Sequence, residues 1–403
     1  MVRNKIIVSL LETDLYKFSM GQVIFHQFPS YITTWSFKCR NKDVVFTDED
    51  VEEIRSQIKK YCELSFTDDE ILYLKGISWL DDSYIEFLRL WHPKFEDFYI
   101  SNEGSSGLTI EATGSWMNTS FYEIPTLAIV NEVYYRNHFK DNYEELKNSY
   151  NEKMGAKIYD LVKGNIKIGN FSEFGLRRRF SGETQDALIK SLSKFQFEGS
   201  NFVGTSNVYL AKKYGVRPVG TMAHEYIMSV GQGNHELNTA YSNKFAMEHW
   251  IKEYGVENGI MLTDTIGSNV FVKDFNKEFA TLFSGVRHDS GAPMLWGENM
   301  IAKYKELGID PKTKTLLFSD SLNFEKAQEL SEHFKDRINV SFGIGTYLSN
   351  DTMVGSLNIV MKVTKCNSYD VAKLSDTPGK GMCKNEEYVK YLQNAIDWRL
   401  END

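Results

Sequence analysis

The chain has 403 residues, of which 42% are hydrophobic and 14% aromatic, and it carries a formal net charge of −9. This length and composition support a packed core and more than one domain, whereas the negative charge excludes nucleic acid or an anionic membrane as the main partner. The apolar run at residues 6–11 is too short for a signal peptide or a membrane span, and the four cysteines form no CxxC pair. We therefore expect a cytoplasmic protein with reduced thiols.

The first 150 residues mix helical and extended patterns. Residues 14–27, 51–64 and 68–77 show the apolar spacing of helices. Alternating patterns at residues 98–100 and 108–112 predict two strands joined by a glycine-containing turn. A long helical stretch then runs from Pro125 to about Tyr150. These patterns predict an N-terminal α+β domain over residues 1–150 that ends in a connecting helix.

From about residue 165 onward, short strand-like segments alternate with helical ones. This alternation predicts a parallel sheet with crossover helices, and the lack of a GxGxxG after the first strand favours an irregular βα barrel over a dinucleotide-binding sheet. We place this barrel at residues 151–354 and expect residues 355–403 to return to the first domain. The predicted strand ends are residues 174–175, 204–207, 220–221, 263–265, 287–291, 319–321 and 343–346.

In a parallel barrel the carboxyl ends of all strands open on one face, so these seven segments should surround one site. Guanidinium groups and glycine-exposed backbone N–H groups bind phosphate, while carboxylates hold Mg²⁺ or sugar hydroxyls. The mixture favours a phosphorylated sugar with a metal ion as the ligand. The residues collected there are Arg177, Arg178, Arg179, Ser206, His224, Asp264, Arg287, Asp289, Asp320 and Thr346.

For several of these residues the pattern alone leaves a plainer interpretation open. His224 follows a strand end in a loop, where α/β enzymes place reactive groups, but a hydrogen-bonded core histidine fits the same pattern. Residues 343–346 (GIGT) fit a phosphate loop or an ordinary glycine turn. Asp264 and Asp320 fit helix caps as well as ligands.

Six segments, in order along nearly the whole chain, carry a family pattern: LETDLYK at 11–17, EFGLRRRFS at 173–181, GTSNV at 204–208, VGTMAHE at 219–225, VRHDSG at 286–291 and KLSD at 373–376. Together they resemble nicotinate phosphoribosyltransferases. The resemblance implies a type II phosphoribosyltransferase fold and a homodimer. It also implies a step of NAD biosynthesis and salvage, in which nicotinate and 5-phosphoribosyl 1-diphosphate give nicotinate mononucleotide and diphosphate. ATP hydrolysis would be coupled to the transfer through a phosphohistidine at His224.

The resemblance also implies roles for single residues. Tyr16 and Phe174 would stack on the pyridine ring, with the partner subunit as a possible source of Tyr16. Carboxylate or phosphate groups would be held by Arg177 or Arg178 together with Arg287. The catalytic set is then His224, Asp289 and Arg287, the contacts to Mg²⁺ through the substrate diphosphate are Asp289 and Asp320, and the remaining substrate-binding residues are Ser206, Thr221, Gly343, Gly345 and Thr346, of which Gly343, Gly345 and Thr346 would hold the 5′-phosphate.

Ser206 bears on the choice of base. Related nicotinamide-using enzymes have an Asp just after this Gly-Thr pair, whereas a Ser avoids a carboxylate facing the carboxylate of nicotinate. We therefore expect the acid, with nicotinamide and quinolinate as the nearest alternatives. A barrel lyase or aldolase would need a Schiff-base lysine at a strand end, and none of the seven has one. A non-catalytic metabolite sensor would have lost His224 or Asp289, and both are present.

Overall fold

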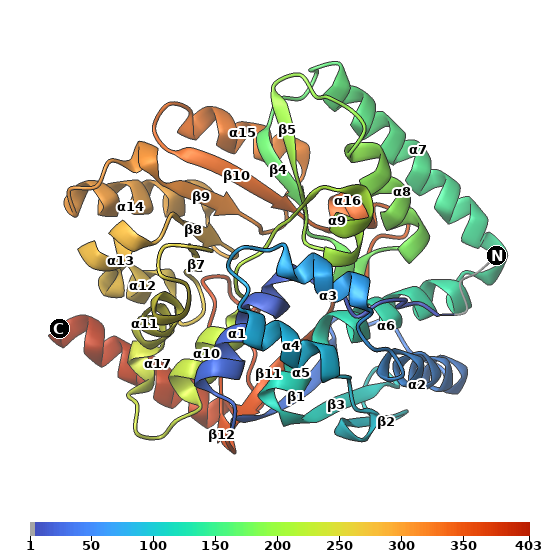
Figure 1. The fold of residues 1–403 in the computed structure, drawn as a ribbon, viewed down its shortest axis with the longest axis horizontal. Coiled ribbons are helices and arrows are strands. Elements are labelled where there is room, and N and C mark those ends of the chain that lie inside the picture. The colour runs from blue at the N-terminus through green and yellow to red at the C-terminus, as the bar shows by residue number, and fades with distance from the viewer. Residues whose placement is uncertain (1–4) are drawn as a thin grey trace.

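The computed structural model describes residues 5–403 and contains two sheets. Seven parallel strands follow the order β6-β5-β4-β10-β9-β8-β7, and five antiparallel strands follow the order β12-β11-β1-β3-β2. Figure 1 shows the parallel sheet in the upper and left part of the molecule and the antiparallel sheet in the lower part. The α/β class with a parallel barrel-like sheet is thus confirmed. The parallel strands are β4 (Gly169–Glu173), β5 (Ser200–Thr205), β6 (Arg217–Pro218), β7 (Ile260–Leu262), β8 (Gly285–His288), β9 (Thr315–Phe318) and β10 (Asn339–Ile344).

Helices pack against both sheets, and their starts follow from the sequence. Thr47 and Thr67 each form a capping box, in which the threonine hydroxyl accepts from the backbone N–H three residues later, and acidic residues fill the first turn of each helix. The helices are α1 (Leu15–Gln27), α2 (Asp48–Cys62), α3 (Asp68–Lys75), α4 (Asp82–Leu90), α5 (Trp116–Ser120), α6 (Glu123–His138), α7 (Tyr143–Val162), α8 (Gly182–Leu192), α9 (Val208–Tyr214), α10 (His224–Gln232), α11 (Ser242–Tyr254), α12 (Ser268–Asp274), α13 (Lys277–Leu282), α14 (Pro293–Glu306), α15 (Phe324–Phe334), α16 (Thr346–Ser349) and α17 (Glu386–Asn402).

The predicted long helix from Pro125 to about Tyr150 is in fact two helices. The first, α6, ends at His138, and a short 3-10 turn at Lys140–Asn142 separates it from α7. This turn carries Asp141 and Asn142, whose side chains compete with the helical backbone for hydrogen bonds and so favour turns. The first of the two helices is buried along most of its length, including Glu123 in its first turn.

The parallel sheet does not close into a complete barrel. Its central strand, β4, pairs with β5 on one side and β10 on the other, and no pairing within residues 5–403 joins β6 to β7. The core of this sheet is aromatic and aliphatic, with Phe171, Phe318 and Phe342 fully buried. The Thr221 hydroxyl donates to the Ile260 carbonyl oxygen at 2.8 Å and so links the segment after β6 to the start of β7. The seven predicted strands are therefore present, but the sheet stays open between its two edge strands, β6 and β7.

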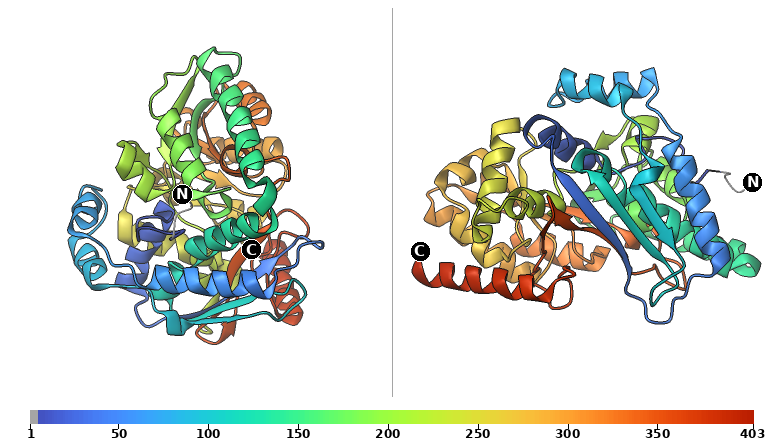
Figure 2. Two further views of the ribbon diagram at one scale, coloured as in Figure 1. Left: turned by 90° about the vertical axis from the view of Figure 1, so that its right-hand side faces the viewer. Right: turned by 90° about the horizontal axis from the view of Figure 1, so that it is seen from below.

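The segment after the parallel sheet divides between the two parts of the molecule. Strand β11 pairs with β1 in the antiparallel sheet, whereas Leu392 and Ile396 of α17 pack with Ile266 and Val270 beside the parallel sheet. Figure 2 shows α17 lying under the helices of the parallel sheet when the molecule is seen from below. The antiparallel strands are β1 (Ile32–Cys39), β2 (Phe98–Ser101), β3 (Thr109–Ser115), β11 (Ile359–Cys366) and β12 (Tyr369–Asp370).

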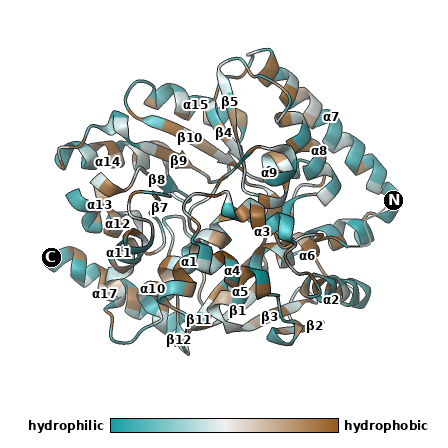
Figure 3. Cartoon of the chain, in the orientation of Figure 1, coloured by the Kyte–Doolittle hydropathy of each residue, from teal (hydrophilic) through white to brown (hydrophobic). Residues whose placement is uncertain are grey.

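The hydropathy pattern agrees with this arrangement. In Figure 3 the strands β9 and β10 carry apolar colour, whereas α2 and α17 at the periphery are largely polar. Across residues 5–403, none of the helices has both the length and the apolar character needed to cross a bilayer.

Candidate active site

A cavity of about 1230 Å³ opens at the carboxyl ends of the parallel strands. Residues that follow strands of the parallel sheet form one side, and Arg40 and Lys362 from the antiparallel sheet contribute to the other. Eight Lys and Arg residues but only six Asp and Glu residues line it, so the cavity is cationic although the chain as a whole is negative. Of the predicted site residues, the lining includes Tyr16, Phe174, Arg177, Arg178, Ser206, His224, Arg287, Asp289, Asp320, Gly345 and Thr346.

At the end of β4, a buried carboxylate fixes the loop that carries Phe174. The Glu173 side chain accepts hydrogen bonds from the Gly175 backbone N–H at 2.6 Å, from Gln185 Nε2 at 3.1 Å and from Thr205 Oγ1 at 2.6 Å. Burial raises the pKa of Glu173 to about 7. These bonds tie the end of β4 to the end of β5 and set the direction of the loop toward the cavity.

The Phe174 ring lies directly on Gly343. A Cβ atom at position 343 would lie 2.3 Å from the Phe174 ring, so only glycine allows this contact. Gly343 therefore supports the ring from below and does not belong to the described lining of the cavity, unlike Gly345 and Thr346. The structure shows a packing role for Gly343, and the phosphate role predicted for it stays a prediction.

The three consecutive arginines have different environments. Arg177 and Arg178 line the cavity, whereas the Arg179 guanidinium is fully buried and bonds to Glu12 Oε1 at 2.5 Å. Burial, followed by the neighbouring positive charge of Arg177, lowers the pKa of Arg178 to about 10, and its Nε has no hydrogen-bond partner in the described chain. Burial also lowers the pKa of Arg177, but the nearby Tyr16 and acidic groups outweigh burial and raise this pKa above its usual value. Two of the three cations thus line the cavity, and the third is paired inside the fold.

The start of α1 lies against the end of β5 in the same chain. Leu15 N donates to the Ser206 carbonyl at 2.9 Å, and Ser206 Oγ donates to Asp14 Oδ1 at 2.6 Å. Asp14, Tyr16 and Ser206 all line the cavity. Tyr16 of this chain thus lines the cavity, and Asp14 places a carboxylate beside Ser206 that the base choice predicted from Ser206 alone did not include. Burial raises the pKa of Asp14.

On the opposite side of the cavity, His224 begins α10 and lies among three charged groups. Its Nε2 is 2.9 Å from Asp264 Oδ1 and 3.7 Å from Asp289 Oδ2. Lys373 Nζ lies 3.1 Å from Asp264 Oδ2, and Ser290 Oγ donates to the same oxygen at 2.5 Å. Burial and then the charge of Lys373 lower the pKa of His224 to about 4, so the imidazole is neutral at neutral pH. Asp264 is therefore a partner of His224 and no helix cap.

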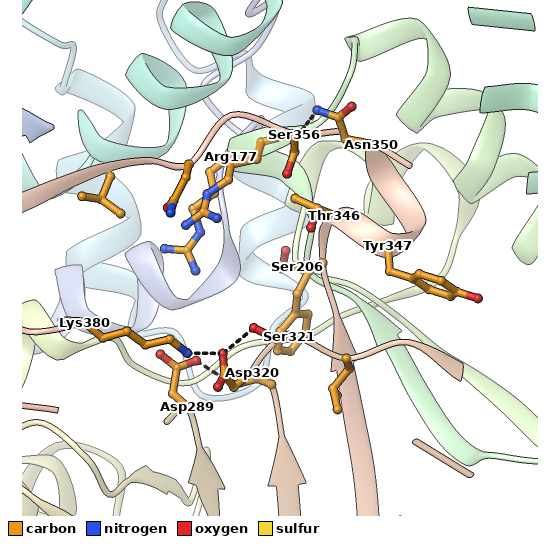
Figure 4. A pocket seen from close by; sticks show the side chains of 18 of the residues that line it. Arg177, Ser206, Asp289, Asp320, Ser321, Thr346, Tyr347, Asn350, Ser356 and Lys380 are labelled. Carbon is orange, nitrogen blue, oxygen red and sulfur yellow. Dashed lines mark hydrogen bonds and ion pairs between the residues drawn. The ribbon is translucent and has the colours of Figure 1, made fainter. Parts of the chain in front are cut away.

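The remaining predicted residues lie nearby. Lys380 Nζ contacts Asp320 Oδ1 at 2.5 Å, and Ser319 Oγ donates to Asp289 Oδ1 at 3.0 Å. Arg287 donates from one terminal nitrogen to the Met222 carbonyl at 2.9 Å. Figure 4 shows the Arg177 guanidinium pointing into the space that Asp289, Asp320 and Lys380 face from the other side. Thr221 does not belong to the described lining, because its hydroxyl is turned to Ile260.

Sequence reasoning missed several charged residues of this site. Lys373 and Asp14 lay within family segments but received no role, and Lys380, Lys362 and Arg40 carried no signal of their own. All five line the cavity. Their common property is that they come from segments outside the βα repeat, so no strand-end pattern could indicate them.

The acidic residues suit a divalent cation in one arrangement better than in another. His224, Asp264 and Asp289 offer ligand atoms within 4.8 Å of one another. However, Lys373 Nζ already neutralises both carboxylates, at 3.1 Å and 3.8 Å, so this cluster does not suit a resident ion. Asp289 and Asp320 face the open cavity, and carboxylate oxygens are ligands that Mg²⁺ prefers. Lysines lie near these two carboxylates as well, Lys373 3.8 Å from Asp289 and Lys380 2.5 Å from Asp320, so the pair fits only an ion that enters with a diphosphate and takes the place of a lysine.

Strand ends of a parallel βα sheet that surround a cation-lined cavity, with a neutral histidine in its wall, define an α/β enzyme of the barrel type. Comparison with known proteins identifies the family. The family model for the nicotinate phosphoribosyltransferase N-terminal domain matches residues 11–131, and the model for the nicotinate phosphoribosyltransferase family matches residues 170–399. The chain belongs to the nicotinate phosphoribosyltransferase family and is an enzyme.

Individual relatives agree over almost the whole length. The nicotinate phosphoribosyltransferase of Cupriavidus necator is 42% identical over 394 residues, which cover 97% of this chain and 98% of the relative. That of Bordetella pertussis is 42% identical and covers 97% and 95%. The crystal structure of the enzyme from Porphyromonas gingivalis superposes with a TM-score of 0.87 at 36% identity and covers 97% of this chain and 100% of the other.

Proposed function

We propose that this enzyme transfers the 5-phosphoribosyl group of 5-phosphoribosyl 1-diphosphate to nicotinate and couples the transfer to ATP hydrolysis through phosphorylation of His224. The relatives' names support the transfer, and one observation carries the coupling. His224 is a neutral, buried imidazole that faces a cationic cavity and is held by an ionised carboxylate. A neutral imidazole is nucleophilic, and the surrounding cations attract phosphates.

The protonation of His224 follows from its partner. Asp264 is ionised: burial raises its pKa, but the electrostatic effects of His224 and Lys373, together with the hydrogen bonds from His224 and Ser290, outweigh burial and hold the pKa low. A neutral imidazole beside an ionised carboxylate carries its proton on Nε2, which leaves the lone pair on Nδ1. Nδ1 would then attack the γ-phosphorus of ATP, the bond from this phosphorus to the bridging oxygen would break, and ADP would leave. The charge of Lys373 acts on His224 and would attract the new phosphoryl group.

The base would bind at the ends of β4 and β5. Phe174 and Tyr16 offer aromatic faces for the pyridine ring, and the Arg177 guanidinium suits a carboxylate. Because Asp14 already places a carboxylate next to Ser206, preference for the acid depends on Arg177 as well as on the absence of a second carboxylate at position 206. Competition between nicotinate, nicotinamide and quinolinate would test this preference directly.

The sugar diphosphate would lie between the two sides of the cavity. Loss of diphosphate leaves positive charge on the anomeric carbon, which a pre-placed carboxylate such as Asp289 stabilises. Arg287 and Arg178 offer donors for phosphate oxygens, and the loop with Gly345 and Thr346 suits the 5′-phosphate. Mg²⁺ bound with the diphosphate would neutralise the leaving group. The assembly we propose is a homodimer, which light scattering of the purified chain would test.

Incubation with γ-labelled ATP, followed by mapping of acid-labile label, tests the coupling. We expect label on His224 that is discharged when nicotinate and the sugar diphosphate are added. His224→Ala should lose the label and ATP stimulation but keep slow transfer, whereas His249→Ala should behave as the wild type because His249 bonds to Gln27 away from the cavity. Transfer without label, or ATP stimulation that His224→Ala retains, would contradict the phosphohistidine.

A further inference from the structure

A group of five charged side chains, three of them buried and two partly exposed, adjoins the cavity, and we call it the Lys17 network: Lys17, Glu123, Arg177, Glu225 and Lys362. Lys17, Glu123 and Glu225 are at most 2% exposed. Lys17 Nζ lies 2.8 Å from Glu123 Oε2 and also contacts Glu225. The network draws these residues from α1, α6, α10, β11 and the turn after β4. It therefore joins elements of both sheets.

Within the network, Glu123 contacts more of the cations that line the cavity than Glu225 does. Its Oε2 faces Lys17, while its Oε1 lies 2.9 Å from Lys362 Nζ and 3.7 Å from an Arg177 terminal nitrogen. Arg177 and Lys362 both line the cavity, whereas Glu123 does not belong to its described lining. One buried carboxylate thus orients two cations that a ligand would meet.

Stability alone does not account for this arrangement. Buried ion pairs are often no more stabilising than apolar side chains of similar volume, because desolvation offsets the attraction. A network that served the core alone would have no reason to direct two of its three cations to a cavity wall. The charges also do not cancel, since three cations face two carboxylates, and the excess positive charge lies on the side of the ligand.

The second carboxylate connects the network to the histidine. Glu225 directly follows His224 in the first turn of α10. Besides Lys17, it accepts from Ser120 Oγ at 2.5 Å and from Trp116 Nε1 at 3.4 Å. The network therefore fixes the start of the helix that carries His224 as well as the two cavity cations.

We propose that Glu123 is a positioning residue of this enzyme: through its two carboxylate oxygens it holds Arg177 and Lys362 in the orientation in which they bind the anionic groups of the substrates. The proposal rests on the proposed function, because it concerns how the same cavity binds nicotinate and diphosphate. Glu123 itself touches no ligand. Its effect is expected in binding, with a smaller effect on the chemical step.

Calorimetric binding of nicotinate and of inorganic diphosphate tests this without turnover. We expect Glu123→Gln to raise both dissociation constants by about tenfold, the scale for a misplaced charged hydrogen bond. Glu12→Gln is the matched control, because it removes an equally buried carboxylate from Arg179, which lies outside the cavity lining. It should lower the melting temperature to a similar extent and leave both dissociation constants unchanged.

Two further variants separate positioning from folding. Glu123→Asp keeps the charge but withdraws the carboxylate, and should give an intermediate loss of affinity. In an Arg177→Ala background, Glu123→Gln should weaken nicotinate binding much less than it does in the wild type, because the group through which it acts is gone. Equal losses in the two backgrounds, or unchanged affinities in Glu123→Gln, would overturn the proposal. A wild type that binds neither probe would refute the proposed function itself and the inference with it.

Discussion

The two halves of the parallel sheet present different chemistry to one cavity. Around the ends of β4, β5 and β10, which we call the glycine half, the lining consists of Phe174, Ser206 and Thr346 in glycine-containing segments. After β7, β8 and β9, which we call the acidic half, each strand is followed closely by an aspartate: Asp264, Asp289 and Asp320.

The halves also differ in the origin of their cations. In the glycine half the guanidinium of Arg177 comes from the turn directly after β4. In the acidic half, Arg287 belongs to β8 itself, but the cations paired with the aspartates are lysines of the C-terminal segment: Lys373 lies 3.1 Å from Asp264, and Lys380 lies 2.5 Å from Asp320. The planar carboxylate of a base suits the guanidinium of the glycine half. In the acidic half, a diphosphate would replace the aspartates as the partner of the lysines. The comparison thus supports the proposal that the glycine half binds the base and the 5′-phosphate, and that the acidic half binds the diphosphate and the reacting carbon of the ribose.

The largest effect that would test this division is expected from Asp289→Asn. Removal of the carboxylate charge should lower kcat by about 10²–10³-fold, the scale for one preorganised electrostatic group, with little change in KM for nicotinate. Steady-state kinetics with each substrate varied would measure it. Asp186→Asn serves as a control, since Asp186 pairs with Lys213 outside the cavity lining. A raised KM for nicotinate at unchanged kcat would instead place base binding in the acidic half.

A smaller effect is expected from Gly343→Ala in the glycine half. The added methyl group would lie 2.3 Å from the Phe174 ring and displace it, which should raise KM for nicotinate by about tenfold, the scale for a lost aromatic stack, and affect kcat less. Gly155→Ala is the matched control, because a Cβ atom there meets nothing within 4 Å. If Gly343→Ala left KM for nicotinate unchanged, Phe174 would not hold the base.

The sequence could predict the acidic half because strand-end aspartates recur with the period of the βα units. The lysines that pair with them could not be predicted, since Lys373 and Lys380 follow a strand of the other sheet and show no such period. Similarly, nothing in the run of three arginines distinguishes Arg179 from its neighbours. The distinction arises from Glu12, 167 residues away in sequence, which pairs with Arg179 alone.

Contacts between distant segments also explain the other differences. The packing of Phe174 on Gly343 joins β4 and β10, and the Ser206–Asp14 bond spans 192 residues. The sequence around a turn glycine indicates only its backbone preference, so the contact of Gly343 with Phe174 could not be predicted from it. The number of strands and the positions of the polar residues after them can be predicted from local patterns. The partners of each side chain depend on the fold.

The substitution Lys373→Met tests the acidic half through the pH dependence of stability and of His224 labelling. Since burial and Lys373 hold the pKa of His224 near 4, loss of the lysine charge should raise this pKa. A histidine pKa below the unfolded value of about 6.5 means that stability is lost as pH falls from about 6.5 toward 4, because only the unfolded chain takes up the proton. Denaturation at pH 7 and pH 5 should therefore show a smaller loss in the variant than in the wild type, and the acid limit of His224 labelling should move to higher pH. An unmoved acid limit would mean that Lys373 does not act on His224.

The smallest effect is expected at the open edge between the halves. Thr221 Oγ1 donates to the Ile260 carbonyl at 2.8 Å, at the place where β6 and β7 do not pair. Thr221→Val should therefore lower the free energy of unfolding by about 1 kcal/mol, the net value of one hydrogen bond. It should leave every KM within about twofold. Thr313→Val removes a hydroxyl-to-carbonyl bond of similar length, 2.7 Å, at an exposed turn and should cost less. Denaturant unfolding and kinetics would be measured together. A changed KM with unchanged stability would mean that the hydroxyl turns to the substrate. Lowered stability with unchanged KM values would mean that this bond fixes the segment leading to His224. A side-chain hydrogen bond would then connect β6 and β7 where backbone pairing is missing.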